Sequence, residues 1–103
     1  MATTFFPVVS TMVKASIGYK ASGNDYHPEN TEYKVSIGYE NNDGDEDCLV
    51  RKVQICYDGK ISGRRSPSFP FINDDWDRVK HAMDQVEAFY VSQNNKALRN
   101  CII

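Results

Sequence analysis

The sequence is poor in the residues that build metal centres and disulfide frameworks. It has two histidines and three cysteines among 103 residues, and no Cys-x-x-Cys pair. An odd number of cysteines favours a reduced, intracellular protein over a disulfide-stabilised secreted one. Neither His27 nor His81 has a cysteine or carboxylate partner at metal-ligand spacing, and no nucleophile lies in a recognised catalytic context. We therefore expect no metal, no cofactor and no enzymatic activity.

Long apolar segments are also lacking. The longest apolar stretch near the start, Phe5–Val9, has five residues and includes a proline, and no basic segment precedes it. A membrane-spanning helix needs about 20 apolar residues and a secretory signal begins with a basic segment, so neither is expected. The length fits one domain with a modest core. These features predict a single cytoplasmic domain with no membrane partner.

Charged residues are arranged in blocks of one sign. The net charge of the chain is −2, but residues 32–47 carry a local net charge of −5, residues 48–72 carry +4 and residues 73–90 carry −3. Such a chain can present one basic and one acidic face, so a polyanion-binding surface is compatible with a negative total. The cations of the basic block are Arg51, Lys52, Lys60, Arg64 and Arg65.

Two segments alternate between apolar and polar residues as β-strands do. In residues 31–40 one face carries Tyr33, Val35, Ile37 and Tyr39, and residues 48–57 follow the same period. Asp43-Gly44 predicts a hairpin turn between the two strands, and Asp58-Gly59 predicts a second tight turn before a short basic limb.

The N-terminal region has a less regular pattern. Residues 1–11 lack a clean period and are expected to form an arm that is ordered only if it docks, whereas residues 12–20 favour a strand. The tetrapeptide Ser-Ile-Gly-Tyr occurs at 16–19 and again at 36–39. The repeat is either a duplicated hairpin limb or two strands of similar composition. Residues 21–30 are rich in turn-forming residues and predict a loop.

A helix is predicted to begin at Asn73 or Asp74, either of which can act as the N-cap, with acidic residues in the first turn. The polar residues 92–95 predict its end. The apolar residues of this helix recur at spacings of three and four, a stripe that must pack against something. They are Trp76, Val79, Met83, Val86 and Tyr90. The apolar tail beyond the helix is expected to pack on a partner subunit or on the sheet.

In this order the segments resemble the positive cofactor four family, small transcriptional coactivators that bind single-stranded DNA. The resemblance covers about residues 32–90. It rests on the strands 33–39 and 53–58, the Lys-Ile-Ser-Gly-Arg-Arg segment 60–65, and the acid- and tryptophan-containing helix start 74–76. Gly63, Arg64, Arg65 and Trp76 lie where that family has a Lys-Pro-Gly-Arg-Lys-Gly segment and a first-turn tryptophan. The chain departs from the family at Ile61-Ser62, in a longer limb before the helix, and in its first 31 residues.

The resemblance implies an α+β fold, in which a curved four-stranded antiparallel sheet is followed by a C-terminal helix that forms a homodimer. Residues 1–31 would be an arm with one extra strand, residues 32–91 the DNA-binding core, and residues 92–103 a tail that extends the dimer contact. The compact length is closer to bacterial and phage-encoded relatives, which implies a host cytoplasm or nucleoid location. The dimer contact would comprise Trp76, Val79, Met83, Val86, Tyr90, Leu98 and Ile102.

Candidate DNA contacts fall into two groups. Cations are expected to bind phosphates and aromatic rings to stack on bases. Alternatively, the arginines beside Gly63 are solvated without a partner, and the tyrosines and Trp76 belong to the core. Arg51 and Lys52 point to opposite faces of one strand, so both cannot line one groove. The candidates are Lys34, Arg51, Lys52, Lys60, Arg64 and Arg65 for phosphates, and Tyr39, Tyr57 and Phe69 for bases.

The leading hypothesis is a non-sequence-specific single-stranded-DNA-binding protein that holds unwound DNA in replication, recombination or transcription. Replication or transcription proteins would be its further partners. RNA is an alternative ligand, since phosphate and stacking contacts serve both nucleic acids. The alternative of a different class is a protein–protein adaptor or small inhibitor that uses its acidic surfaces.

Overall fold

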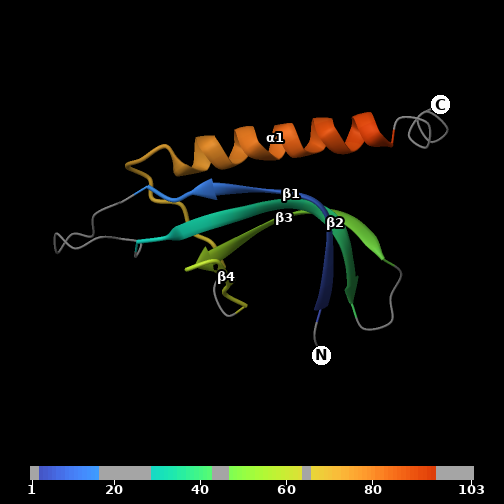
Figure 1. Ribbon diagram of the computed structural model, residues 1–103, viewed down its shortest axis with the longest axis horizontal. Helices are drawn as coiled ribbons and strands as arrows, with labels where there is room; N and C mark the ends of the chain where they lie inside the picture. Colours follow the sequence, from blue (N-terminus) through green and yellow to red (C-terminus); the bar gives the residue numbers. More distant parts are fainter. Residues whose placement is uncertain (1–2, 17–28, 43–46, 64–65, 95–103) are drawn as a thin grey trace.

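The computed structural model describes residues 3–16, 29–42, 47–63 and 66–94 (Figure 1). Four strands form one antiparallel sheet in the order β1-β2-β3-β4, and one helix, α1, follows them. This confirms the predicted α+β class with a C-terminal helix. The elements are β1 (Thr3–Lys14), β2 (Thr31–Asn42), β3 (Cys48–Tyr57), β4 (Lys60–Ile61) and α1 (Asp75–Gln93).

Strand β1 begins earlier than predicted. It pairs with β2 from Thr3 opposite Asn42 to Lys14 opposite Glu32, so the segment that was expected to be ordered only on docking is docked on the sheet as an edge strand from Thr3 onward. A register shift between Pro7 and Val9 interrupts the alternation, and this hides the strand in the sequence. Proline is tolerated there because β1 lies at the sheet edge. The predicted strand at 12–20 was wrong in its bounds, and residues 17–20, with most of the first Ser-Ile-Gly-Tyr copy, lie outside the described residues.

Two tight turns were predicted, one between β2 and β3 and one between β3 and β4. Strands β2 and β3 pair in antiparallel register from Thr31 opposite Tyr57 to Glu40 opposite Cys48, as a hairpin requires, although Asp43-Gly44 itself lies outside the described residues. At the second turn the φ angles of Asp58 and Gly59 are 51° and 80°. A two-residue hairpin loop of type I′ needs positive φ at both positions, and Asp-Gly supplies them.

The sheet is strongly bent, so that its strands form an arch with α1 along the convex side (Figure 1). Gly38 lies where β2 passes close to β1. A β-carbon at this position would be 2.3 Å from the carbonyl oxygen of Phe6 and 2.8 Å from the Cα of Pro7. Only glycine permits this approach, which lies next to the bulge in β1. The face of the sheet that does not contact α1 is concave (Figure 1).

The core lies between α1 and the convex face. Helix α1 packs over β1 and β2, the two strands it contacts most. Because side chains alternate along a strand, the odd-numbered residues of β2 and β3 face the helix and the even-numbered ones face the concavity. Each fully buried aliphatic side chain contributes about 1.5–3 kcal/mol. The buried core residues are Tyr33, Val35, Ile37, Ile55, Val79, Ala82 and Val86.

Both ends of α1 agree with the prediction. Asp74 is the N-cap residue, and the Oδ1 atom of Asn73 accepts a hydrogen bond of 3.0 Å from the amide of Asp75. At the other end the amide and side chain of Asn94 both donate to the carbonyl oxygen of Tyr90. Across the described ranges, no helix has the length and apolar character needed to span a membrane.

Candidate nucleic-acid interface

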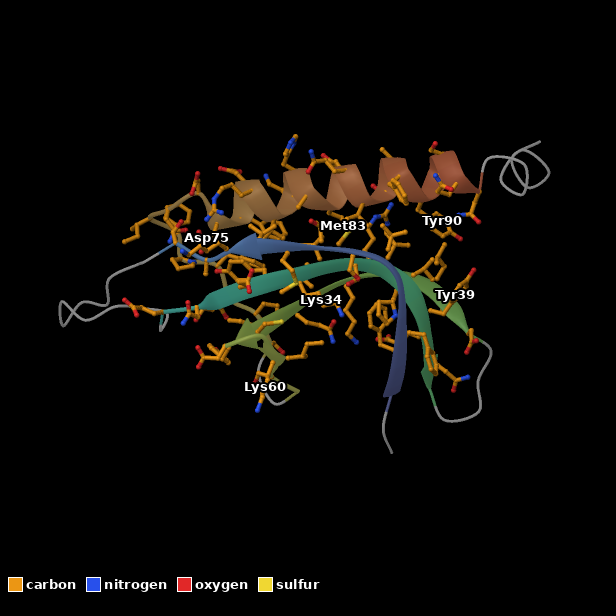
Figure 2. All side chains as sticks on the ribbon, viewed as in Figure 1. Lys34, Tyr39, Lys60, Asp75, Met83 and Tyr90 are labelled. Atoms are coloured by element: carbon orange, nitrogen blue, oxygen red, sulfur yellow. The ribbon has the colours of Figure 1, made fainter. Side chains whose placement is uncertain are left out.

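The concave face carries lysines from three adjacent strands. Lys14 of β1, Lys34 of β2 and Lys52 of β3 occupy positions whose side chains point away from the helix. Figure 2 shows Lys34 in the hollow of the arch, on the side of the sheet opposite Met83 and Tyr90. In the strand register Lys34 lies between Met12 and Gln54, at the centre of the face. The fold therefore gathers cations that are far apart in the sequence.

Two glutamates moderate the charge of this face. Glu40 forms an ion pair with Lys52, with 2.5 Å between Oε2 and Nζ, and Glu32 lies opposite Lys14 in the register. Lys34 takes part in none of the ion pairs found among the described residues. It is the cation of the concave face that is best placed to meet an incoming anion.

The middle of the concave face is polar. The hydroxyl groups of Ser10 and Ser36 hydrogen bond across β1 and β2 at 2.8 Å. Next to Lys34 in the register, Gln54 has a buried side-chain oxygen with no hydrogen-bond partner among the described residues. Such orphaned polar atoms are uncommon in protein interiors and usually have a water molecule or ligand nearby. This surface therefore suits a polar ligand with hydrogen-bond donors better than an apolar one.

The aromatic residues expected to stack on bases lie on the helix side instead. Tyr39 hydrogen bonds to Tyr90 of α1, and this bond, together with burial, raises the pKa of Tyr90. Tyr57 packs against the core. The Phe69 ring lies 4.9 Å from that of Tyr33 and 5.0 Å from that of Trp76. Strand alternation and packing therefore separate these rings from the lysines of the concave face.

The remaining predicted cations are divided between surfaces. Arg51 forms an ion pair with Glu87 of α1, so it lies on the helix side while its neighbour Lys52 lies in the concavity, as alternation requires. Lys60 is exposed on β4, opposite Tyr57. Arg64 and Arg65 lie outside the described residues. The structure therefore brings Lys34 and Lys52 together and places Arg51 elsewhere.

Two residues on the concave face were not predicted as contacts, Lys14 and Phe5. The Cζ atom of Phe5 lies 2.9 Å from where a β-carbon of Gly38 would be, so the ring reaches over this glycine. The ammonium group of Lys52 lies 5.1 Å from the ring centroid. Phe5 was missed because residues 1–11 have no clear period. Gly38 was the available signal in the sequence, because a glycine within an otherwise regular strand often marks a place where another group approaches the backbone closely.

Some of the apolar α1 residues that were predicted at the dimer contact pack instead against the sheet of their own subunit. Val79 and Val86 are 1% and 3% exposed because they pack on the sheet. Trp76 is half exposed, and Met83 lies beside it in an apolar groove between α1 and β3. This groove exists because the helix covers β1 and β2 more fully than β3. Tyr90 lies at its far end, near Leu49 and Val91, while Leu98 and Ile102 lie outside the described residues.

A buried carboxylate fixes the start of the helix to the sheet. Asp75 is inaccessible to solvent and accepts hydrogen bonds from the Tyr33 hydroxyl at 2.7 Å, the Ser16 amide at 3.0 Å and the Arg78 guanidinium at 2.6 Å. Burial alone would raise the pKa of Asp75, but the hydrogen bonds from Ser16 and Tyr33 and the charge of Arg78 outweigh it and lower the pKa. Every contact is internal, so we assign Asp75 a structural role.

Comparison with known proteins gives no match: no protein-family model fits the chain, and no curated protein and no solved structure is significantly similar to it. The concave face and the α1–β3 groove are the two surfaces whose residues suggest a ligand or a partner. In addition, no cluster of three or more metal-binding side chains occurs within the described ranges.

Proposed function

We propose that the protein binds single-stranded nucleic acid without sequence specificity, in the concavity of its sheet, and that it acts as a homodimer. The observation that carries the proposal is the position of Lys34, which projects from the central part of a concave, polar face with Lys14 and Lys52 on the neighbouring strands. Phosphate contacts from lysines supply most of the free energy of non-specific binding. A single strand fits such a hollow more readily than a stiff duplex.

The charge distribution supports binding on the concave face of the sheet over binding on the helix side. Helix α1, on the opposite side of the sheet, contains two cations (Arg78 and Lys80) and, besides the buried Asp75, three carboxylates (Asp77, Asp84 and Glu87). A polyanion therefore meets an excess of carboxylates along the helix, whereas in the concavity it meets Lys34, which takes part in none of the ion pairs found among the described residues. Lys60, exposed on β4, and Arg64 and Arg65, which lie outside the described residues, remain candidate phosphate contacts from the sequence. The biological role we infer is to hold unwound DNA, with RNA as the alternative ligand.

The homodimer is supported by the residues that face the groove between α1 and β3. Around the midpoint between Met83 and Asp84, the helix positions are arranged nearly symmetrically: Trp76 mirrors Val91, and Lys80 mirrors Glu87. When two such helices pack antiparallel about a twofold axis, Lys80 of each copy faces Glu87 of the other. Apolar residues then meet at both ends, and an isologous contact needs this self-complementarity. The partner we propose for this groove is a second copy of the chain.

The test of the binding function is a fluorescence-anisotropy titration with a single-stranded oligonucleotide and the matching duplex at two salt concentrations. We expect tighter binding to the single strand, with an affinity that falls steeply as salt rises because bound counterions are released. Preference for the duplex, or an affinity insensitive to salt, would contradict the proposal. An RNA strand of the same sequence, titrated in parallel, decides between the two nucleic acids.

A protein–protein adaptor is the second candidate, and one observation favours it. Phe71 and Ile72, two adjacent large apolar residues just before α1, are 102% and 74% exposed, and exposed apolar patches often mark contact sites for other proteins. In a homodimer this pair lies at the helix end that meets the partner's Leu49 and Val91. A protein that stays monomeric and retains no nucleic acid would instead favour the adaptor.

A further inference from the structure

An aromatic ring, an ammonium group and a carboxylate meet on the concave face, near the start of β1 and the end of β2. The ring of Phe5 reaches over Gly38, the ammonium of Lys52 lies 5.1 Å from the ring centroid, and the carboxylate of Glu40 holds that ammonium at 2.5 Å. Phe5 and Glu40 are direct partners in the strand register. The cluster is on the concave face and joins all three long strands of the sheet.

The lack of a side chain at Gly38 has a second consequence besides the close approach of the strands. Because no β-carbon stands beneath it, the Phe5 ring can lie low on the sheet instead of standing upright in the concavity. The ring is only partly buried, so it retains surface that faces solvent. The neighbours of Phe5 include a cation, Lys52, above the ring and a carboxylate, Glu40, opposite it in the strand register.

We propose that Phe5, Lys52 and Glu40 form a subsite for one nucleotide, in which the base stacks on Phe5, the phosphate binds Lys52 and Glu40 accepts a hydrogen bond from an amino group of the base. A nucleotide presents the three complementary features: a π-face, an anion and, in cytosine, adenine or guanine, an exocyclic amine. Stacking on an aromatic residue is the usual way in which proteins hold unpaired bases. This inference rests on the proposed single-strand binding.

The carboxylate gives the subsite a preference among bases. An ionised glutamate only accepts hydrogen bonds, and it pairs well with the N4 amine of cytosine. The corresponding atom of uracil or thymine is a carbonyl oxygen, which the carboxylate repels. Binding a nucleotide also releases Lys52 from the ring and from Glu40, because the ammonium moves to the phosphate. The groove as a whole is then non-specific, but this position favours bases that carry an amine.

The experiment compares deoxycytidine and deoxyuridine oligomers of equal length, which differ in this amine and in the adjacent ring nitrogen. For the wild type we expect the cytidine oligomer to bind about fivefold more tightly. Phe5→Ala should weaken binding of both oligomers about tenfold, whereas Phe5→Trp should retain it. Phe5→Leu is the matched control that keeps apolar volume without a π-face, and it should behave like Phe5→Ala. Glu40→Gln should retain binding and lose the preference, because an amide can both donate and accept.

The outcomes separate this inference from the proposed function. If the wild type binds single strands tightly but treats both oligomers alike, or if Phe5→Ala binds as the wild type does, the subsite is overturned and the general function stands. If the wild type binds neither oligomer, both proposals fail. Circular dichroism of each variant establishes that a lost affinity does not come from lost folding, since Phe5 lies near one end of β1.

Discussion

The hydroxyl of Tyr33 donates a 2.7 Å hydrogen bond to the carboxylate of Asp75, across 42 positions of sequence and entirely out of solvent. Tyr33 belongs to the central strand β2 and Asp75 to the first turn of α1. The same carboxylate also binds the Ser16 amide at the end of β1. One ionised group thus holds the helix at a defined place on the convex face, and leaves the concave face uncovered.

Removal of this bond should destabilise the fold without affecting ligand contacts. Tyr33→Phe keeps the ring and deletes the hydroxyl, so a buried carboxylate loses one of its donors. We expect a loss of about 1–3 kcal/mol in the free energy of unfolding, which corresponds to roughly 4–8 °C in Tm per kcal/mol for a domain of this size. Thermal denaturation followed by circular dichroism measures it. Tyr90→Phe is the comparison variant, because its hydroxyl is hydrogen bonded to Tyr39 and not to a buried carboxylate. An equal loss of stability in both variants would show that the bond to Asp75 contributes no more than a bond between two neutral groups.

The lowered pKa of Asp75 gives an expected pH dependence. A carboxyl with a lower pKa in the folded than in the unfolded state contributes stability above its unfolded pKa, about 3.9, and this contribution is lost as pH falls through the folded pKa. Asp75→Asn should therefore be less stable than the wild type by a constant amount between about pH 5 and 8. Below about pH 4 the difference should shrink. Urea denaturation across this range tests it, and a difference that grows in acid would refute the assigned shift.

The close approach of β1 to β2 depends on Gly38. In Gly38→Ala the new methyl group would lie 2.3 Å from the backbone oxygen of Phe6, a contact that only movement of β1 can relieve. Overpacking of this kind costs about 1–3 kcal/mol. Gly63→Ala is the matched control, because a β-carbon there meets nothing within 4 Å and should change stability by less than about 0.5 kcal/mol. Urea denaturation of both variants makes the comparison, and equal stabilities would mean that β1 does not approach β2 this closely.

Much of the fold could be predicted because its local signals are strong. The alternation of residues 31–40 and 48–57 identified β2 and β3, and it also grouped Tyr39 with the core residues Tyr33, Val35 and Ile37. The helix was predicted from its spacing and acidic first turn. The bounds of β1 were predicted wrongly because the irregularity after Pro7 destroys its period.

The candidate site was harder to predict because alternation does not say which face of a sheet a helix covers. Tyr39 and Tyr57 were chosen as aromatic residues near strand ends, and Phe69 as a further candidate, yet all three lie on the helix side of the sheet. Phe5 and Lys14 reach the concave face only through pairing of β1 with β2, a contact between residues distant in sequence. Such pairing depends on the whole sheet, so no short motif reveals it.

The proposed dimer predicts a charge-reversal experiment. Lys80→Glu puts two carboxylates together across the twofold axis, and Glu87→Lys puts two ammonium groups together, so each should weaken dimerisation about fivefold to tenfold. The double variant restores opposite charges and should recover most of the affinity. Sedimentation velocity over a range of concentrations measures the association. Because Glu87 also pairs with Arg51 in its own subunit, thermal stability must be followed in parallel. A double variant as weak as the worse single one would argue against antiparallel packing.

Neighbouring cations on β3 offer the sharpest test of which face binds nucleic acid. Lys52→Gln and Arg51→Gln remove the same charge from adjacent positions, but Lys52 lies in the concavity and Arg51 pairs with Glu87 on the helix side. For single strands each lost phosphate contact should reduce the slope of log K against log salt by about 0.7. We expect this reduction for Lys52→Gln and for Lys34→Gln, and an unchanged slope for Arg51→Gln. Fluorescence-anisotropy titrations at four salt concentrations give the slopes. If Arg51→Gln lowers the slope and Lys34→Gln does not, the strand binds beside the helix and the concave face has another role.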